Sequence, residues 1–165
     1  MDFALNEEQE MLRDSVRSYL ADKVPLTRVR ELMETEAGFD PELWSEMAQM
    51  GWQAMAIPEA YGGAGYSSFE LGIILEEMGR MLTPAPFLSS VVLAANTIML
   101  SGSESLKQEL LPEIATGERR GAVAIVEASG RWDPAGIELT ATADGDAVVL
   151  SGTKSYVVDG HTADT

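Results

Sequence analysis

The sequence contains no cysteine and only one histidine, His161, and these absences narrow the chemistry open to it. Without cysteine it can build neither a disulfide framework nor a thiolate metal site. With one histidine it cannot build a histidine-rich metal centre, and a Ser-His-Asp triad would depend on His161 alone. Because His161 directly follows Asp159-Gly160, we interpret it as an exposed turn residue.

Basic residues and long apolar runs are also scarce. Lysine and arginine number 11 against 27 aspartates and glutamates, which gives a formal net charge of -16. This balance disfavours nucleic acid and anionic membranes as partners. The longest strongly apolar stretch, 88–100, is too short to span a bilayer, and the opening residues lack the basic and apolar regions of a signal peptide. We therefore expect a cytoplasmic protein with no membrane segment.

Helical spacing of apolar residues dominates the first two thirds of the chain. Residues that favour helix N termini mark where each expected helix begins. The helices are expected over 6–22, 26–34, 40–51, 67–82 and 88–100, with another starting at 103. On the fourth helix, Glu76 and Arg80 are expected to pair on the outer face. In the last helix, Pro112 is expected to bend or end the helix.

The segment from Ile57 to Tyr66 cannot continue a helix, because it contains one proline and three glycines. Glycines before a helix N terminus resemble a phosphate cradle, where backbone donors attract anions. Neither a Rossmann fingerprint nor a P-loop fits, since helices are expected on both sides of the segment. We interpret it as a structural turn, and a direct ligand contact stays open as the alternative.

Near Gly121 the pattern changes to short segments typical of strands, expected over 121–126, 137–142, 147–150 and 155–158. The dipeptide Asp144-Gly145 favours a hairpin and hence an antiparallel meander. The expected fold class is α+β multidomain: an all-α helical bundle over 1–120, then the first antiparallel strands of a β-barrel-like middle domain over 121–165. A sheet that ended at Thr165 would keep an open edge, so we expect further chain, or a second chain, to complete it.

Five segments carry a resemblance to a known family. They are Leu5–Gln9, Ile57–Gly65, Glu76–Arg80, Leu111–Glu118 and Leu150–Gly160. In this order they resemble the acyl-CoA dehydrogenase family along the whole chain. The resemblance implies a helical domain, a central β domain and a C-terminal four-helix domain. The last of these is expected to be absent from these 165 residues, and FAD is expected between the β domain and that second helical domain.

The reaction that the resemblance implies is α,β-dehydrogenation of an acyl-CoA thioester. A carboxylate removes the α-proton while the β-hydrogen leaves as hydride to FAD. In most of the family the catalytic glutamate lies in the C-terminal domain, expected beyond Thr165, so no catalytic residue is assigned here. Helices over 68–82 and 88–101 are expected to line the acyl pocket. Electron-transfer flavoprotein is the expected electron acceptor, and the assembly is expected to be a homotetramer or an α2β2 heterotetramer.

Two motifs of the family's β domain touch the flavin, and both can be placed on this chain by position. The residues implied are Ile125, Val126, Glu127, Trp132, Tyr156, Val157 and Val158. Val126 and Val158 stand where the family has hydroxyl residues, and Trp132 stands where it has a small one. Backbone amides can still serve as donors, because an amide needs no particular side chain.

These departures keep two alternatives open. The first is a non-catalytic partner subunit with a degenerate flavin site, similar to one subunit of the actinobacterial heteromeric enzymes that degrade steroid side chains. The second is a flavin monooxygenase or oxidase on the same scaffold. The colour of the purified protein distinguishes the first alternative from an active flavoprotein, because a partner subunit purified alone is expected to be colourless. Reaction of the reduced flavin with oxygen separates the second.

Overall fold

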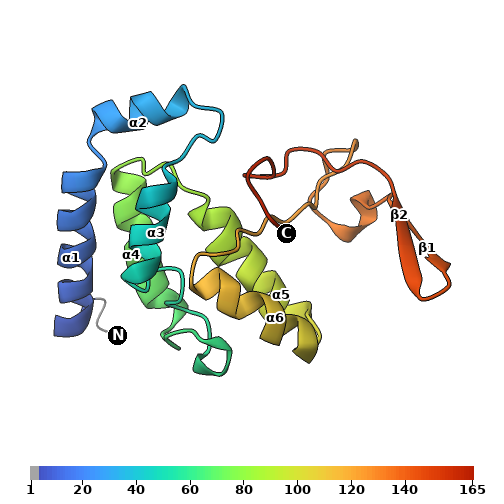
Figure 1. The fold of residues 1–165 in the computed structure, drawn as a ribbon, viewed down its shortest axis with the longest axis horizontal. Coiled ribbons are helices and arrows are strands. Elements are labelled where there is room, and N and C mark those ends of the chain that lie inside the picture. Colours follow the sequence, from blue (N-terminus) through green and yellow to red (C-terminus); the bar gives the residue numbers. More distant parts are fainter. Residues whose placement is uncertain (1–3) are drawn as a thin grey trace.

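The computed structural model describes residues 4–165, which form six α-helices followed by a β-hairpin (Figure 1). The α-helices are α1 (Glu7–Lys23), α2 (Leu26–Met33), α3 (Pro41–Gln49), α4 (Ser68–Arg80), α5 (Ala95–Ser101) and α6 (Glu104–Ala115). A π-helix, Leu88–Ala94, leads directly into α5. Two 3-10 turns cover Glu59–Tyr61 and Pro134–Gly136, and the strands are β1 (Thr140–Asp144) and β2 (Ala147–Ser151). The expected order of a helical part followed by an antiparallel β part is confirmed.

Local capping explains where the helices begin. The Asn6 side chain accepts a hydrogen bond from the Gln9 amide at 2.9 Å, and the Gln9 side chain accepts one from the Asn6 amide, which makes a capping box. Ser67 and Glu70 make the same arrangement at the start of α4. Asp40 caps α3, whose first residue is Pro41. These starts were predicted from the sequence and are confirmed.

Pro112 was predicted to bend or end helix α6, and the second of these outcomes is wrong. The helix neither ends nor is interrupted there but continues to Ala115, and the Thr116 amide donates to the Pro112 carbonyl. Proline removes one helical donor. Leu110, Leu111 and Ile114 are nonetheless buried on one face of the helix. Packing of this face therefore maintains the helix past the proline.

The apolar stretch 88–100 is helical, as predicted, but its first half is a π-helix and its burial is one-sided. Val91, Ala94 and Ile98 are buried, whereas Leu88 is 49% and Leu100 is 86% exposed. In a π-helix each carbonyl bonds the fifth residue ahead, so the turn is wider than in an α-helix. Two consecutive buried serines, Ser89 and Ser90, lie in this wide turn.

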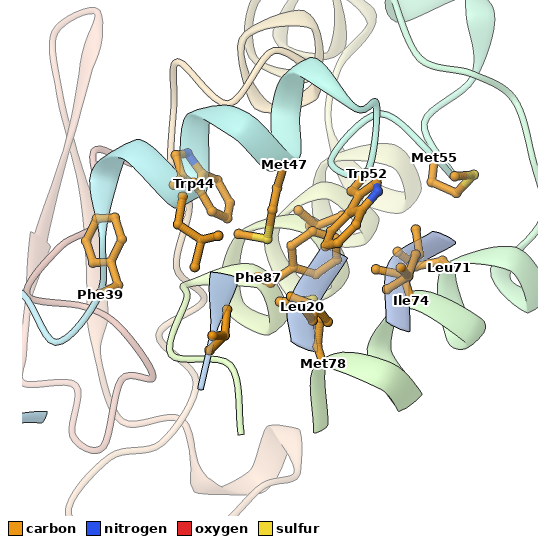
Figure 2. Close-up of a cluster of buried hydrophobic side chains, with 14 of the residues drawn as sticks. Leu20, Phe39, Trp44, Met47, Trp52, Met55, Leu71, Ile74, Met78 and Phe87 are labelled. Atoms are coloured by element: carbon orange, nitrogen blue, oxygen red, sulfur yellow. The ribbon is translucent and has the colours of Figure 1, made fainter. Parts of the chain in front are cut away.

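The main hydrophobic core lies where α1, α3, α4 and the start of the π-helix meet. Figure 2 shows Trp44, Met47 and Trp52 above Leu20 and Phe87. The Trp44 and Phe87 rings meet edge-on with centroids 6.3 Å apart, an arrangement that aromatic rings favour. A second cluster, which includes Ile57, Ile98 and Ile114, joins α5 and α6 to the glycine-containing loop.

A buried carboxylate links α1 to α4. Glu77 is 1% exposed and accepts hydrogen bonds from Arg17 at 2.6 and 3.0 Å and from Arg80 at 3.1 Å. The bonds from Arg17 are the main reason why the pKa of Glu77 lies below its usual value. The predicted pair between Glu76 and Arg80 is wrong, because the inward-facing neighbour Glu77 takes the Arg80 side chain.

Beyond residue 120 the chain is mostly irregular, and only the hairpin is regular. Strand β1 pairs antiparallel with β2 from Thr140 with Ser151 to Asp144 with Ala147, and the hairpin extends away from the helices at the far right of Figure 1. Gly145 has φ +62°, as a tight hairpin turn requires. The hairpin expected at Asp144-Gly145 is confirmed.

The strands expected over 121–126 and 155–158 are not formed, and the one expected over 137–142 starts only at Thr140. Two isolated backbone bonds hold 121–126, from the Ala122 amide to the Thr165 carbonyl and from the Ser155 amide to the Val126 carbonyl. A strand needs a continuous ladder of such bonds. In the second segment, Tyr156 has φ +55°, outside the extended region.

Candidate functional site

Two of the sequence motifs, 29 residues apart, come together in the structure. The Ser155 amide donates to the Val126 carbonyl at 2.7 Å, and the Lys154 ammonium donates to the Ile125 carbonyl at 3.2 Å. We call residues 125–128 and 154–158 the paired edge. The paired edge contains six of the seven predicted site residues. The seventh, Trp132, lies outside it.

The buried side chain of Glu127 links the paired edge to residues 138 and 139. Its buried carboxylate accepts hydrogen bonds from the Lys154 ammonium at 2.6 Å and from the backbone amides of Glu138 and Leu139. Its pKa is lowered, chiefly by the Lys154 bond. Both carboxylate oxygens are thus engaged by the protein. Lys154 was missed in the sequence, because nothing local in the sequence signals a partner 27 residues away.

The outer surface of the paired edge carries an aromatic ring and unused backbone donors. Tyr156 is 85% exposed, and Ile125 and Val158 are partly exposed. Within residues 4–165, the amides of the exposed residues Ile125 and Ala128 and those of Val157 and Val158 donate to no acceptor. An exposed amide is a donor for whatever lies against it. The edge can therefore bind a ligand that offers several acceptors beside a flat apolar surface.

Val126 differs from its neighbours because its side chain points into the protein and is 4% exposed. A side chain at this position reaches the core and not the outer surface. Val126 as a whole residue is covered by the protein, so its side chain does not line the outer surface of the paired edge. The absence of a hydroxyl at position 126 therefore weakens the proposed flavin binding less than the sequence alone suggests.

Trp132 lies outside the paired edge, in the irregular segment before the 3-10 turn Pro134–Gly136, and is 72% exposed. Its neighbours Arg131 and Asp133 pair with each other at 3.0 Å, and Asp133 also caps the following 3-10 turn. Among the described residues, no ring contact joins Trp132 to Tyr156. The Arg131 guanidinium is thus already paired and is not a free anion-binding group.

The glycine-containing loop before α4 is a structural turn, as predicted. Its amides all bond inside the protein: those of Gly62, Gly63, Ala64, Gly65 and Tyr66 reach the carbonyls of Glu59, Pro58, Ala54, Ile57 and Met55. A side chain at Gly63 would place its Cβ 1.9 Å from the Ile57 carbonyl oxygen. The glycines permit this close backbone packing, and the amides of residues 62–66 are already bonded and cannot cradle a phosphate.

The two arginines at the junction also bond within the chain. Arg119 pairs with Glu113 at 2.5 Å, and Arg120 pairs with Asp164 at 3.0 Å. The Arg120 guanidinium also lies over the Phe39 ring, 5.5 Å from its centroid. Their role is therefore to fasten the end of the chain to the helices. His161 lies exposed in the turn after Asp159-Gly160, as predicted.

An apolar cavity of about 250 Å³ lies where α4 ends and the π-helix begins. Leu75 and Met78 line it from α4, and Leu82 and Leu88 line it from the connection and the π-helix. These residues belong to the two helical stretches that were expected to line an acyl pocket. Other cavities, of about 320 and 330 Å³, are lined by α1, α4 and nearby loops and by no residue beyond 120.

Residues 4–165 lack the features of two other kinds of site. They contain no helix that is long and apolar enough to cross a membrane. They also contain no group of three or more histidine, aspartate and glutamate side chains arranged to hold a metal ion.

The sequence is similar to known proteins along its whole length. The family described as acyl-CoA dehydrogenase, N-terminal domain, matches residues 6–118. A short-chain specific acyl-CoA dehydrogenase from Clostridium acetobutylicum is 34% identical over 100% of this chain and 44% of its own length. This chain therefore spans less than half of that relative.

Solved structures agree with the sequence comparison. A variant of the Tcur3481-Tcur3483 steroid ACAD is 38% identical with a TM-score of 0.84, over 95% of this chain and 43% of its own. An acyl-CoA dehydrogenase from Bacillus anthracis, solved in complex with FAD, is 28% identical with a TM-score of 0.81, over 93% of this chain and 27% of its own. The family match, the fold and the order of the elements agree: this chain belongs to the acyl-CoA dehydrogenase family.

Proposed function

We propose that this chain is part of a flavin-dependent acyl-CoA dehydrogenase that forms an α,β double bond in an acyl-CoA thioester. The paired edge is the observation that carries the proposal. It brings the two segments that the family resemblance assigns to the flavin, 125–127 and 156–158, side by side through the bond between Ser155 and Val126. The relative from Bacillus anthracis, solved with FAD, supports the choice of cofactor.

The residues of the paired edge fit a flavin. An isoalloxazine ring offers carbonyl and nitrogen acceptors along one edge, and the unused amides of Ile125, Ala128, Val157 and Val158 supply donors without side-chain hydroxyls. The exposed Tyr156 ring supplies an apolar surface for the flat ring system. When bound, FAD supplies the hydride acceptor, and these residues bind and orient it.

The cavity between α4 and the π-helix is the proposed place for part of the acyl group. Leu75, Met78, Leu82 and Leu88 surround it with apolar side chains, which suit a hydrocarbon. Leu82 and Leu88 are largely exposed, so this apolar surface is open to a ligand. The resemblance assigns the base to the C-terminal helical domain, and no residue of this chain is proposed for that role.

A non-catalytic partner subunit is the second candidate, and specific observations favour it. Trp132 occupies a position where the family has a small residue, and the adjacent Arg131 is already paired with Asp133. The steroid ACAD among the relatives is itself named as a pair of proteins. In either case we propose a tetramer, homomeric or α2β2, with electron-transfer flavoprotein as the electron acceptor of the active assembly.

The test is the visible spectrum of the protein produced from its complete reading frame. The leading proposal predicts flavin absorption in the protein purified alone, and bleaching of that absorption when an acyl-CoA is added without oxygen. A colourless protein that becomes yellow only on co-expression with a second subunit would establish the partner-subunit reading. A protein that stays colourless in both preparations would refute both.

A substitution tests the site itself. Tyr156→Ala is expected to raise the Kd for FAD about three- to tenfold, because an aromatic contact contributes about 0.5–1.5 kcal/mol. Tyr66→Ala is the matched control: Tyr66 is also exposed but lies on the side of α1 and α4. Equal Kd values for the two variants, measured by flavin fluorescence titration, would exclude Tyr156 from the flavin site.

A further inference from the structure

Two consecutive serines hold the paired edge against the helices. Ser89 and Ser90 are fully buried in the π-helix. The Ser89 hydroxyl donates to the Asp159 carboxylate at 2.7 Å and lies 3.1 Å from the Pro86 carbonyl. The Ser90 hydroxyl accepts from the Gly121 amide at 3.1 Å and donates to the Gly121 carbonyl at 3.2 Å. Each serine thus bonds a different segment of the C-terminal part.

These bonds form one of two polar connections between the helices and the C-terminal part; the other consists of the bonds of Arg119 and Arg120 to Asp164 and Thr165. Every hydrogen bond that links residues 5–115 to residues 121–165 involves Ser89 or Ser90. Asp159 directly follows Val158, and Gly121 lies four residues before Ile125. Ser89 therefore holds the residue that directly follows one arm of the paired edge, and Ser90 holds the chain four residues before the other arm.

The packing around the serines leaves little freedom. A Cβ atom at Gly121 would lie 2.5 Å from the Ala94 side chain, so this backbone rests directly on the π-helix. Asp159 has φ +54°, which fixes the direction of the turn that carries its carboxylate. The same π-helix contributes Leu88, next to Ser89, to the apolar cavity. One wide helical turn thus contacts both the proposed acyl pocket and the segment proposed to hold the flavin.

We infer that Ser89 is a positioning residue for FAD: its hydrogen bond to Asp159 sets the place of Tyr156, Val157 and Val158 relative to the helices. This inference rests on the proposed function. Ser89 itself is buried beneath the turn and acts through Asp159. The wide π-turn serves this purpose because it lets two successive hydroxyls reach two separate segments.

The test compares three variants of the protein produced from its complete reading frame. Ser89→Ala removes the donor of the hydrogen bond, and Asp159→Ala removes its acceptor. Asp159→Asn keeps an oxygen that can accept the bond, and asparagine tolerates the positive φ of this position. Ser101→Ala is the matched control, because the Ser101 hydroxyl donates to the Thr97 carbonyl within its own helix. FAD affinity is measured by fluorescence titration, and hydrogen exchange of residues 155–162 is followed without flavin.

The expected result is a Kd for FAD about tenfold higher in Ser89→Ala and in Asp159→Ala, a change of about 1.4 kcal/mol. The double variant is expected to be no weaker than either single one, because both remove the same bond. Exchange should accelerate in residues 155–162 and not in α1 to α4. Asp159→Asn and Ser101→Ala should stay within about twofold of the unchanged protein.

Three outcomes would overturn the inference. If the unchanged protein takes up no FAD, alone or with a partner subunit, the proposed function fails and the inference fails with it. If it binds FAD but Ser89→Ala and Asp159→Ala bind as Ser101→Ala does, the inference fails while the proposed function stands. If Ser89→Ala does not fold, Asp159→Ala decides, because Asp159 lies in a surface turn; unchanged affinity in that variant refutes the inference.

Discussion

At the scale of single residues, Glu77 joins two helices through charge. Its carboxylate is buried, whereas Arg17 and Arg80 keep much of their guanidinium surface in water. A buried carboxylate that lost its charge would leave these donors without their acceptor. Since the folded-state pKa of Glu77 lies below its usual value, its ionisation favours the folded state at neutral pH. This contribution is present above the usual carboxyl pKa and is lost as the pH falls through the folded-state pKa.

Glu77→Gln is accordingly expected to destabilise the fold by about 1–3 kcal/mol at neutral pH, as for other hydrogen bonds to charged groups. The difference from the unchanged protein should shrink in acid, where Glu77 is protonated in both states. Urea unfolding at several pH values measures this. Glu76→Gln, at the exposed neighbouring residue, is the control and should change stability by less than about 0.5 kcal/mol. A loss that is independent of pH would contradict the assigned role.

Two glycines are expected to respond in opposite directions to the same substitution. Gly63→Ala places a methyl group against the Ile57 carbonyl, so the loop must shift, and we expect a loss of about 2 kcal/mol or more. Gly72→Ala has open space and lies inside α4, so we expect a gain of about 0.5–1 kcal/mol. Chemical denaturation of both variants compares them directly. If the two variants changed the free energy of unfolding by similar amounts, the loop would not require glycine at position 63.

At the scale of elements, helix α4 shows how local sequence determines a boundary. Ser67 and Glu70 form the capping box, and the hydrogen bonds from Ser67 and Gln9 lower the pKa of Glu70 to about 2. Ser67→Ala is expected to cost about 1 kcal/mol, the usual effect of removing a serine cap. Ser68→Ala, one residue later, is the control and should be nearly neutral. Thermal unfolding measures both, and equal effects would argue against the cap.

The elements also show which parts of the fold the sequence could predict. Caps and apolar spacing are local, so α1 to α4 and the hairpin were predicted near their observed bounds. The π-helix was not, because its extra residue per turn leaves no distinct apolar period over a stretch as short as Leu88–Ala94. Continuation of α6 through Pro112 depends on tertiary packing, which overrides local propensity.

The site was predictable only in part, for a similar reason. Family resemblance located the two segments of the paired edge, but the orientation of each side chain depends on distant partners. Val126 faces inward, and Glu127 bonds Lys154 and two backbone amides. The role of Ser89 could not be predicted from the sequence, because its hydrogen-bond partner Asp159 lies 70 residues away. None of these contacts joins residues that are neighbours in sequence.

At the scale of the whole molecule, a helical part and a β part meet along a narrow junction. Ser89, Ser90, Arg119 and Arg120 supply its polar contacts, and the hairpin extends well beyond it (Figure 1). In the proposed function, the cavity of the helical part receives part of the acyl group and the paired edge of the β part receives the flavin. The junction therefore lies between the two proposed ligands, where a small shift alters their relative position.

The central claim is that residues 125–128 and 156–158 together receive the flavin. Hydrogen exchange of the complete protein, with and without FAD, tests this most directly. FAD is expected to slow exchange in both segments, whose amides donate to no acceptor within residues 4–165, and to leave exchange in the loop 57–66 unchanged. Unchanged exchange in either segment in the presence of bound FAD, or protection centred on the loop 57–66, would contradict it.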